Sequence, residues 1–238
     1  MKKLLFALAF IGLSLSTFGQ IDRSIRPKPA PERQLKIGNA ESFELKNGLK
    51  VIVVSDRKLP RITYSLIMDR KPINEGDKSG VADLMGEMLT EGTKNRTKEQ
   101  LDEEIDFMGA SLSTGSSSAF SSGLSKYKEE LIALLADVVL NPSFPTESFD
   151  KLKKQSESAL ESSKEEPSAI AGNLVSAVLF GKDHPYGQVM TQASLEQIQL
   201  EDIKNMYAKL VSPENTYIAI VGDISKKEAK KLVKKYFK

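Results

Sequence analysis

Residues 79–93, SGVADLMGEMLTEGT, decide the fold that we predict for this chain. Apolar side chains recur along this stretch with a period near 3.6 residues, which predicts an amphipathic helix. The members of that apolar stripe are Val81, Leu84, Met85, Met88 and Leu89. We expect Ser79 to cap the first turn and Gly92 to end the helix in a left-handed conformation.

The face opposite the apolar stripe carries two acids. Asp83 and Glu87 lie four residues apart, so their side chains are neighbours on the helix, and Gly86 lies beside them. Two carboxylates at this spacing can hold a hard cation such as calcium or magnesium. The interpretation that we favour is a solvated polar face.

The same stretch resembles the zinc helix of the pitrilysin/insulinase family of metallopeptidases, which includes the mitochondrial processing peptidases. Members of that family typically read G-x-x-H-x-x-E-H-M-L-F-x-G-T here. The positions of this chain that match the frame are Gly80, Met88, Leu89, Gly92 and Thr93. The resemblance implies that Asp83 and Glu87 replace two histidine ligands and that Gly86 replaces the general-base glutamate. The frame of an inverted zinc site is therefore present without its working side chains.

The resemblance also places a third zinc ligand, a glutamate, on the long polar helix that we predict over residues 147–166. Our alignment puts Ala159 there, and Glu157 and Glu161 lie close enough for a small register shift to replace it. The only histidine, His184, belongs to an HPYG stretch that lies outside the zinc site in the family, and we expect a loop histidine bonded to backbone. We predict no catalytic residue, no metal ligand and no cofactor in this chain.

Residues 109–122 are rich in serine and carry no charge. Composition alone would favour a flexible linker, but the stretch lies between two strongly patterned helices, which favours two strands. In the family, the first strand is the sheet edge beside the zinc, where substrate is held as an added strand by main-chain hydrogen bonds. The resemblance therefore makes Leu112, Ser113, Thr114 and Gly115 the candidate substrate-binding residues, and we expect proline at Ser113 to remove a donor. A merely flexible edge stays the alternative.

The first 19 residues have the features of a secretory signal peptide, because Lys2 and Lys3 precede an apolar run over residues 4–15. The run is too short for a membrane span, and the chain has no cysteine for a lipid anchor or a disulfide. Residues 20–41, which contain three prolines, fit an extended linker, and a disordered terminus stays the alternative. The resulting expectation is a periplasmic protein without a stable membrane anchor.

The remaining residues, 42–238, fit one large domain. Asn47-Gly48 predicts a hairpin, β-branched runs such as residues 62–68 and 216–221 predict strands, and helical patterns alternate with them. These elements predict an α+β fold with a mixed, largely antiparallel sheet packed against helices. The resemblance covers this whole range. Because family members usually carry a second, related domain, the chain is either a short protein or the first half of a longer one.

The charge balance gives no support to nucleic-acid binding. Removing residues 1–19 would take away two of the 34 basic residues and none of the 32 acidic ones, which leaves a net charge near zero. The partners that the resemblance implies are a peptide substrate and an active subunit of the same family.

Three functions compete. The first, which we favour, is a non-catalytic homologue: a substrate-binding or structural subunit that pairs with a partner carrying H-x-x-E-H in the cell envelope. Zinc hydrolysis needs about three protein ligands, an open position for water and a base, and two histidines and the base are absent here. The second is an active metallopeptidase with atypical ligands such as Asp83 and Glu87. The third is a periplasmic scaffold or binding domain unrelated to proteolysis.

Overall fold

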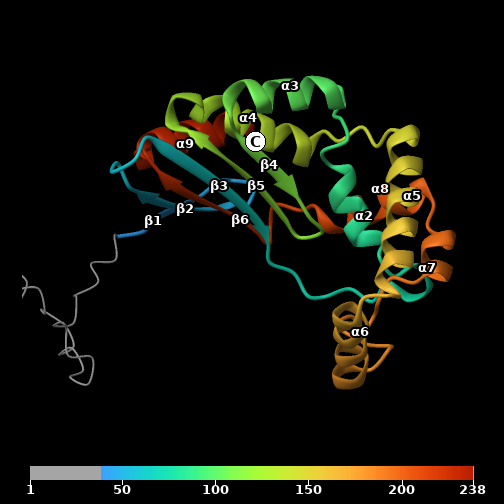
Figure 1. Cartoon of the computed structure of the whole chain (residues 1–238). Coiled ribbons are helices and arrows are strands. Elements are labelled where there is room, and N and C mark those ends of the chain that lie inside the picture. Colours follow the sequence, from blue (N-terminus) through green and yellow to red (C-terminus); the bar gives the residue numbers. More distant parts are fainter. Residues whose placement is uncertain (1–38, 238) are drawn as a thin grey trace, which may run out of the picture. The chain divides into compact units, whose positions relative to one another are not determined.

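A six-stranded sheet runs through residues 39–237, the part of the chain that the computed structural model describes (Figure 1). The strands are β1 (Glu41–Glu44), β2 (Lys50–Ser55), β3 (Arg61–Met68), β4 (Ser111–Thr114), β5 (Ser118–Leu124) and β6 (Thr216–Gly222). They lie in the order β1-β2-β6-β3-β5-β4, and among the described strands only β2 and β6 pair in parallel. The prediction of an α+β fold with a mixed, largely antiparallel sheet is confirmed.

Alternation of side chains explains the central strands. Every second residue of β3 is buried, and the residues between them are partly exposed. The buried members are Ile62, Tyr64, Leu66 and Met68. The hairpin predicted at Asn47-Gly48 is confirmed, since β1 and β2 pair antiparallel and Gly48 adopts a φ of +89°. Glycine enters this left-handed region at little cost because it has no Cβ.

Helices form two groups around the sheet. Within residues 39–237 they are α2 (Val81–Met88), α3 (Lys98–Met108), α4 (Lys128–Leu140), α5 (Thr146–Ser163), α6 (Pro167–Phe180), α7 (Gln192–Gln197), α8 (Leu200–Leu210) and α9 (Lys226–Tyr236), with short 3-10 turns η1 (Gly76–Lys78) and η2 (Ser125–Tyr127). Figure 1 shows α3, α4 and α9 over one face of the sheet, and α2, α5, α7 and α8 as a second group beside it.

Each helix group has its own apolar core. In the first, Leu131 of α4 and Val233 of α9 belong to one cluster with Ile218 of β6. In the second, Met85 of α2 clusters with Ile203 of α8, and both side chains are fully buried. The apolar stripe predicted on residues 79–93 is confirmed, because all five of its side chains are buried in this second core.

The sequence has a capping-box spacing at Thr97/Gln100, Ser225/Glu228 and Ser194/Gln197, and capping boxes form at the starts of α3 and α9, where Thr97 and Ser225 are the capping residues. The box expected from Ser194 and Gln197 does not form. Helix α7 begins earlier, at Gln192, and Thr191 caps it with Ser194 as its partner inside the first turn. Thr191 and Ser194 each have a suitable partner three residues later. Thr191 is the cap because it has the extended backbone of an N-cap residue, whereas Ser194 lies inside the helix.

No helix within residues 39–237 is both long enough and apolar enough to cross a membrane. The predicted signal peptide, residues 1–19, and most of the predicted linker, residues 20–41, lie outside the described residues. Both stay predictions, as does the periplasmic location.

Candidate functional site

Helix α2 carries most of the stretch that resembles the family's zinc helix, and a half-buried acid caps its N-terminus. The helix follows Gly80, which has a φ of +104°. Ser79, the predicted cap, instead donates its hydroxyl to the carbonyl of Gly76 at 3.0 Å. The Glu75 carboxylate accepts from the backbone N–H groups of Gly80 at 2.6 Å and Ala82 at 3.3 Å. The Ser79 prediction is wrong because the left-handed turn at Gly80 brings Glu75 to the first free N–H groups.

The C-terminal end of α2 comes earlier than predicted. The helix ends at Met88. A hydrogen bond with the three-residue spacing of a 3-10 turn, from the Glu91 N–H to the Met88 carbonyl at 3.2 Å, follows its last turn. Gly92 has the expected left-handed backbone, with a φ of +130°, but it lies in the loop beyond the helix. Its carbonyl accepts from the Ser143 N–H at 3.1 Å, so this glycine positions the loop rather than ending the helix.

Backbone atoms close the space beside Gly86, the residue that the resemblance aligns with the family's general base. A Cβ atom placed on Gly86 would lie 2.3 Å from the carbonyl carbon of Gly115 and 2.6 Å from the nitrogen of Ser116. Both atoms belong to the turn between β4 and β5, so no side-chain rotation relieves the overlap. Helix α2 and this turn therefore approach so closely that only glycine fits at position 86.

Two side chains hold the β4–β5 turn in this place. The Thr114 hydroxyl donates to the Gly86 carbonyl at 2.7 Å, and the Arg70 guanidinium donates to the Ser116 carbonyl, also at 2.7 Å. Burial raises the pKa of the Glu75 carboxyl, and its two N–H donors and the charge of Arg70 oppose that rise. Arg70 and Glu75 were missed by the sequence analysis. An acid shortly before a helix start was the available signal for Glu75.

The two acids that the resemblance aligns with histidine ligands are exposed to solvent. Asp83 and Glu87 are both exposed on the polar face of α2. Although the Glu87 side chain as a whole is exposed, partial desolvation of its carboxyl, followed by the negative charges of Asp83 and Glu91, raises the pKa of this group. Within residues 39–237, no group of three or more His, Cys, Asp or Glu side chains is arranged to hold a metal ion. Asp83 and Glu87 carry like charges and repel each other along the helix surface. The described residues place no third ligand for a metal ion beside them.

Helix α5 carries the three candidates for the third ligand. Ala159 and Glu161 are exposed, whereas Glu157 is half-buried. The inward face of this helix is apolar, and Phe149 and Leu160 pack there against the core that contains α2. The structure thus brings α5 beside α2, as the resemblance implied, without gathering acids from the two helices into one cluster.

Strand β4 lies at one edge of the sheet and pairs only with β5 among the described strands. It contains Leu112, Ser113 and Thr114, while Gly115 begins the turn that follows. Leu112 and Thr114 are half-buried, and Ser113 is exposed. All four candidate substrate-binding residues therefore lie on one continuous edge segment, beside the closed position at Gly86.

The hydrogen-bond pattern fixes which backbone groups face outward. The Gly115 N–H donates to the Ser118 carbonyl at 2.8 Å, and Ser113 pairs with Phe120 in the register. Because antiparallel pairs alternate between bonded and non-bonded positions, Ser113 bonds toward β5 and the backbone of Leu112 and Thr114 faces away from it. The structure moves the expected outward donor from Ser113 to these two residues.

His184 lies in the loop after α6. Its Nδ1 atom accepts from the Tyr186 N–H at 3.1 Å, and its ring stacks on Phe180 with centroids 5.7 Å apart. The expectation of a loop histidine bonded to backbone agrees with this geometry.

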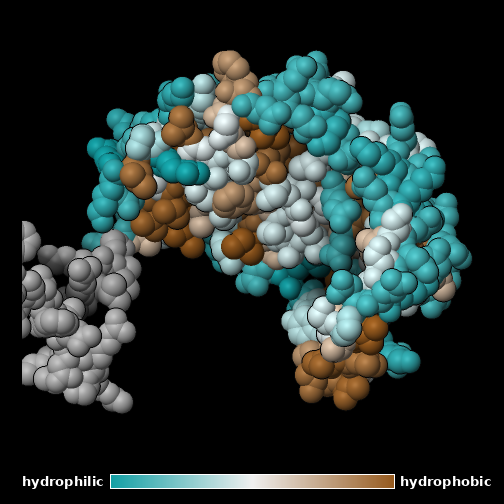
Figure 2. All heavy atoms as spheres, in the orientation of Figure 1, coloured by the Kyte–Doolittle hydropathy of each residue, from teal (hydrophilic) through white to brown (hydrophobic). Residues whose placement is uncertain are grey.

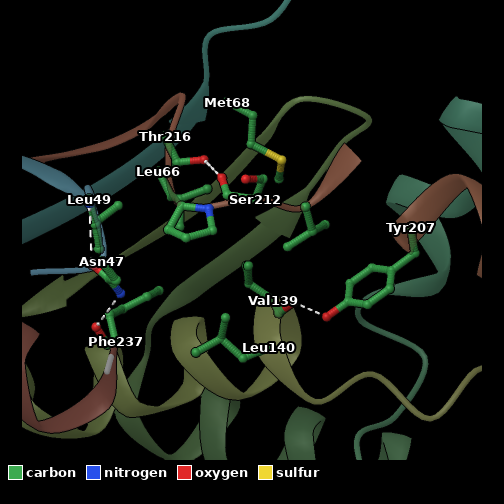
Figure 3. A pocket seen from close by; sticks show the side chains of 12 residues that line it. Asn47, Leu49, Leu66, Met68, Val139, Leu140, Tyr207, Ser212, Thr216 and Phe237 are labelled. Carbon is green, nitrogen blue, oxygen red and sulfur yellow. Dashed lines mark hydrogen bonds between the residues drawn. The ribbon is translucent and has the colours of Figure 1, made fainter. Parts of the chain in front are cut away.

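An apolar cavity of about 220 Å³ lies away from this edge, between the sheet and the ends of α4 and α8 (Figure 3). Leu66, Met68 and Leu140 contribute to its walls. The Tyr207 hydroxyl, which points into this region, donates to the Val139 carbonyl at 2.9 Å. The Tyr207 hydroxyl is therefore engaged with backbone, and the walls of the cavity are mainly apolar.

Two family models of one peptidase family match this chain. The profile of "Insulinase (Peptidase family M16)" matches residues 50–192, and that of "Peptidase M16 inactive domain" matches residues 197–238. An uncharacterized zinc protease of Rickettsia bellii is 26% identical over 207 residues, which cover 84% of this chain and 50% of that protein. A non-peptidase homologue of Helicobacter pylori is 23% identical, over 64% of this chain and 36% of its own length.

Solved structures give the same answer. The crystal structure of a peptidase M16 inactive domain from Pseudomonas fluorescens superposes with a TM-score of 0.76 at 28% identity, covering 83% of this chain and 50% of that one. The chain thus spans half the length of the Rickettsia relative and of this structure. With a matching profile over most of its length, the same fold and the frame of the zinc helix in place, the chain belongs to the insulinase family, peptidase family M16.

Proposed function

We propose that this chain is a non-catalytic member of the family, which binds extended polypeptide along β4 and pairs with an active subunit in the cell envelope. The observation that carries the proposal is the closure at Gly86, where a Cβ would lie 2.3 Å from backbone. Hydrolysis at a zinc centre needs a water, a base and room for both. This chain offers neither a base at that position nor the space for one.

Edge binding survives the loss of zinc chemistry. An added strand is held by main-chain hydrogen bonds, which need no particular side chain. The outward backbone of Leu112 and Thr114 supplies such groups, and the exposed Ser113 leaves room beside them. This supports binding of an extended segment at the same edge that family peptidases use for substrate.

The proposed pairing follows from the zinc ligands that this chain lacks, because a partner would have to supply the zinc centre. Zinc needs about three ligands, and the described residues hold no suitable cluster. A relative described as a non-peptidase homologue, in Helicobacter pylori, supports the existence of such chains in the family. The location in the envelope rests on the predicted signal peptide alone.

The test measures metal and activity in the purified chain. We expect no stoichiometric zinc by elemental analysis and no chelator-sensitive cleavage of an unstructured peptide. One bound zinc per chain, together with cleavage that Asp83→Ala abolishes, would overturn the proposal in favour of an active enzyme with atypical ligands.

The partner is tested separately, by affinity capture from the native envelope with the tagged chain as bait. We expect an M16 peptidase carrying H-x-x-E-H among the captured proteins. Its absence, with other proteins captured instead, would favour a scaffold unrelated to proteolysis.

A further inference from the structure

Helix α6 exposes an apolar surface that no other part of residues 39–237 covers. None of its residues is buried. The exposed fractions are 59% for Leu174, 80% for Val178 and 69% for Leu179. Figure 2 shows a brown, hydrophobic patch over α6, and in Figure 1 this helix stands apart from the two helix groups. Contiguous apolar patches of this kind mark interaction surfaces in soluble proteins.

The sequence of α6 is that of a buried helix. Its 14 residues include no charged side chain. Ile170, Leu174 and Val178 follow one another at a spacing of four residues and form a continuous stripe along the helix. A helix this short is marginal in water without packing, and covering the stripe would remove apolar area from water.

We infer that α6 is a self-association surface, on which a second copy of this chain packs its own α6 in antiparallel orientation. The charges at its two ends point to this occupant. Glu165 and Glu166 precede the helix, Lys182 follows it, and all three are exposed. None of them takes part in an ion pair within the described part of the chain.

The positions of these charges fit a two-fold axis at Leu174. This residue lies midway between Glu166 and Lys182 in the sequence. An antiparallel pair centred there brings Lys182 of each copy near the acids of the other. It also sets the two helix dipoles side by side in opposite directions, which is favourable. Asp183, next to Lys182, offsets part of this attraction. The charges therefore set the orientation, and the apolar stripe supplies the affinity.

Other occupants fit less well. The helix is about 21 Å long, shorter than the bilayer core of about 30 Å, and the two acids before it disfavour an anionic membrane surface. A single pair of such helices buries less than a standard interface of about 1,600 Å². We therefore expect a weak, reversible dimer with a dissociation constant of about 10–100 μM.

The first test is sedimentation equilibrium of the full chain over a range of concentrations. We expect a monomer–dimer equilibrium, and we expect the double variant Leu174→Lys/Val178→Lys to raise the dissociation constant at least about tenfold. Phe107→Lys is the matched control, because Phe107 is another apolar residue, 81% exposed, on a different helix. A monomer at all concentrations, or equal association of the wild type and the α6 variant, would overturn the inference.

The second test reverses the charges. Lys182→Glu alone and Glu165→Lys/Glu166→Lys alone should each weaken the dimer about threefold to tenfold. The combined triple variant should return to within about twofold of wild type, because the attraction is restored with opposite sign. If the triple variant associates no better than the single reversals, the antiparallel arrangement is wrong. Circular dichroism spectra identical to wild type establish that every variant is folded.

Discussion

At the scale of single residues, two glycines inside helices have opposite environments. A Cβ on Gly86 would overlap the backbone of Gly115, whereas a Cβ on Gly172 of α6 would meet nothing within 4 Å. Alanine is intrinsically favoured over glycine inside a helix by roughly 0.5–1 kcal/mol. At position 86 that gain is overridden, because inserting even one methyl group into close packing costs about 1–3 kcal/mol.

We therefore expect Gly86→Ala to lower the free energy of unfolding by about 1–2 kcal/mol and Gly172→Ala to raise it by about 0.5 kcal/mol. Urea unfolding at low protein concentration measures both. The two substitutions are chemically identical and both lie in helices, so each is the control of the other. A stabilising Gly86→Ala would mean that the turn moves freely and that the base position is open.

Glu87 predicts a pH-dependent stability. Burial and the charges of Asp83 and Glu91 raise its pKa, so the folded state binds the proton more readily than the unfolded state. The ionised side chain is thus unfavourable above both pKa values, and this cost is lost as the pH falls through the folded-state pKa. We expect Glu87→Gln to stabilise the protein at pH 7 by less than about 1 kcal/mol, because solvent screens the exposed acids.

This gain should disappear as the pH falls below about 4, near the ordinary carboxyl range. Urea unfolding at both pH values measures it, with Glu103→Gln on the exposed face of α3 as the control. A difference between wild type and Glu87→Gln that persists unchanged in acid would contradict the electrostatic explanation.

At the scale of elements, the edge strand and the zinc helix are one unit. The Thr114 hydroxyl of β4 donates to the Gly86 carbonyl of α2 at 2.7 Å, which ties the edge strand to this helix. The close approach of the Gly115 and Ser116 backbone to Gly86 adds a second contact between the same two segments. An ordered edge lowers the entropy cost of adding a strand.

The outward donors of β4 give the test of strand addition. Leu112→Pro removes an N–H that faces away from β5, whereas Leu112→Ala removes the same side chain and keeps the donor. We expect the proline variant to bind an extended peptide at least about threefold more weakly than the alanine variant, since one net hydrogen bond contributes roughly 1 kcal/mol. Calorimetry measures the two affinities. Equal affinities for two folded variants would rule out strand addition at this edge.

At the scale of the whole molecule, a zinc site would draw on three elements: α2, α5 and the β4–β5 turn. Asp83→His and Glu87→His restore two ligands on α2, and Ala159→Glu supplies a carboxylate on α5. Gly86→Glu restores the base, but it requires the β4–β5 turn to leave its place beside α2. We expect the quadruple variant to lack peptidase activity and to be less stable than the variant that keeps Gly86.

Zinc affinity separates the ligand question from the steric one. The Asp83→His/Glu87→His variant should bind zinc weakly, and adding Ala159→Glu should tighten binding at least about tenfold. Competition with a chromogenic chelator measures this. No gain from Ala159→Glu would move the third position to Glu157, the half-buried acid of α5. Full activity in the quadruple variant would show that the closure at Gly86 is not an obstacle.

Sequence by itself determined the elements and the family. Periodicity identified α2 and its five buried side chains, Asn47-Gly48 identified the first hairpin, and the alternation of strands and helices gave the fold class. The motif frame also aligned Gly86 with the position of the family's general base, which stays a prediction. These features are local: each depends on spacing within a few residues, which the sequence states directly.

Tertiary structure decided why those residues are there. The outward backbone of Leu112 depends on strand pairing, and the overlap at Gly86 joins segments that are far apart in the chain. Gly86 and Gly115 lie 29 positions apart, and nothing in the spacing of either indicates that their backbones meet. Close packing between distant segments is set by the whole fold, so the reason for glycine at position 86 exists only in three dimensions.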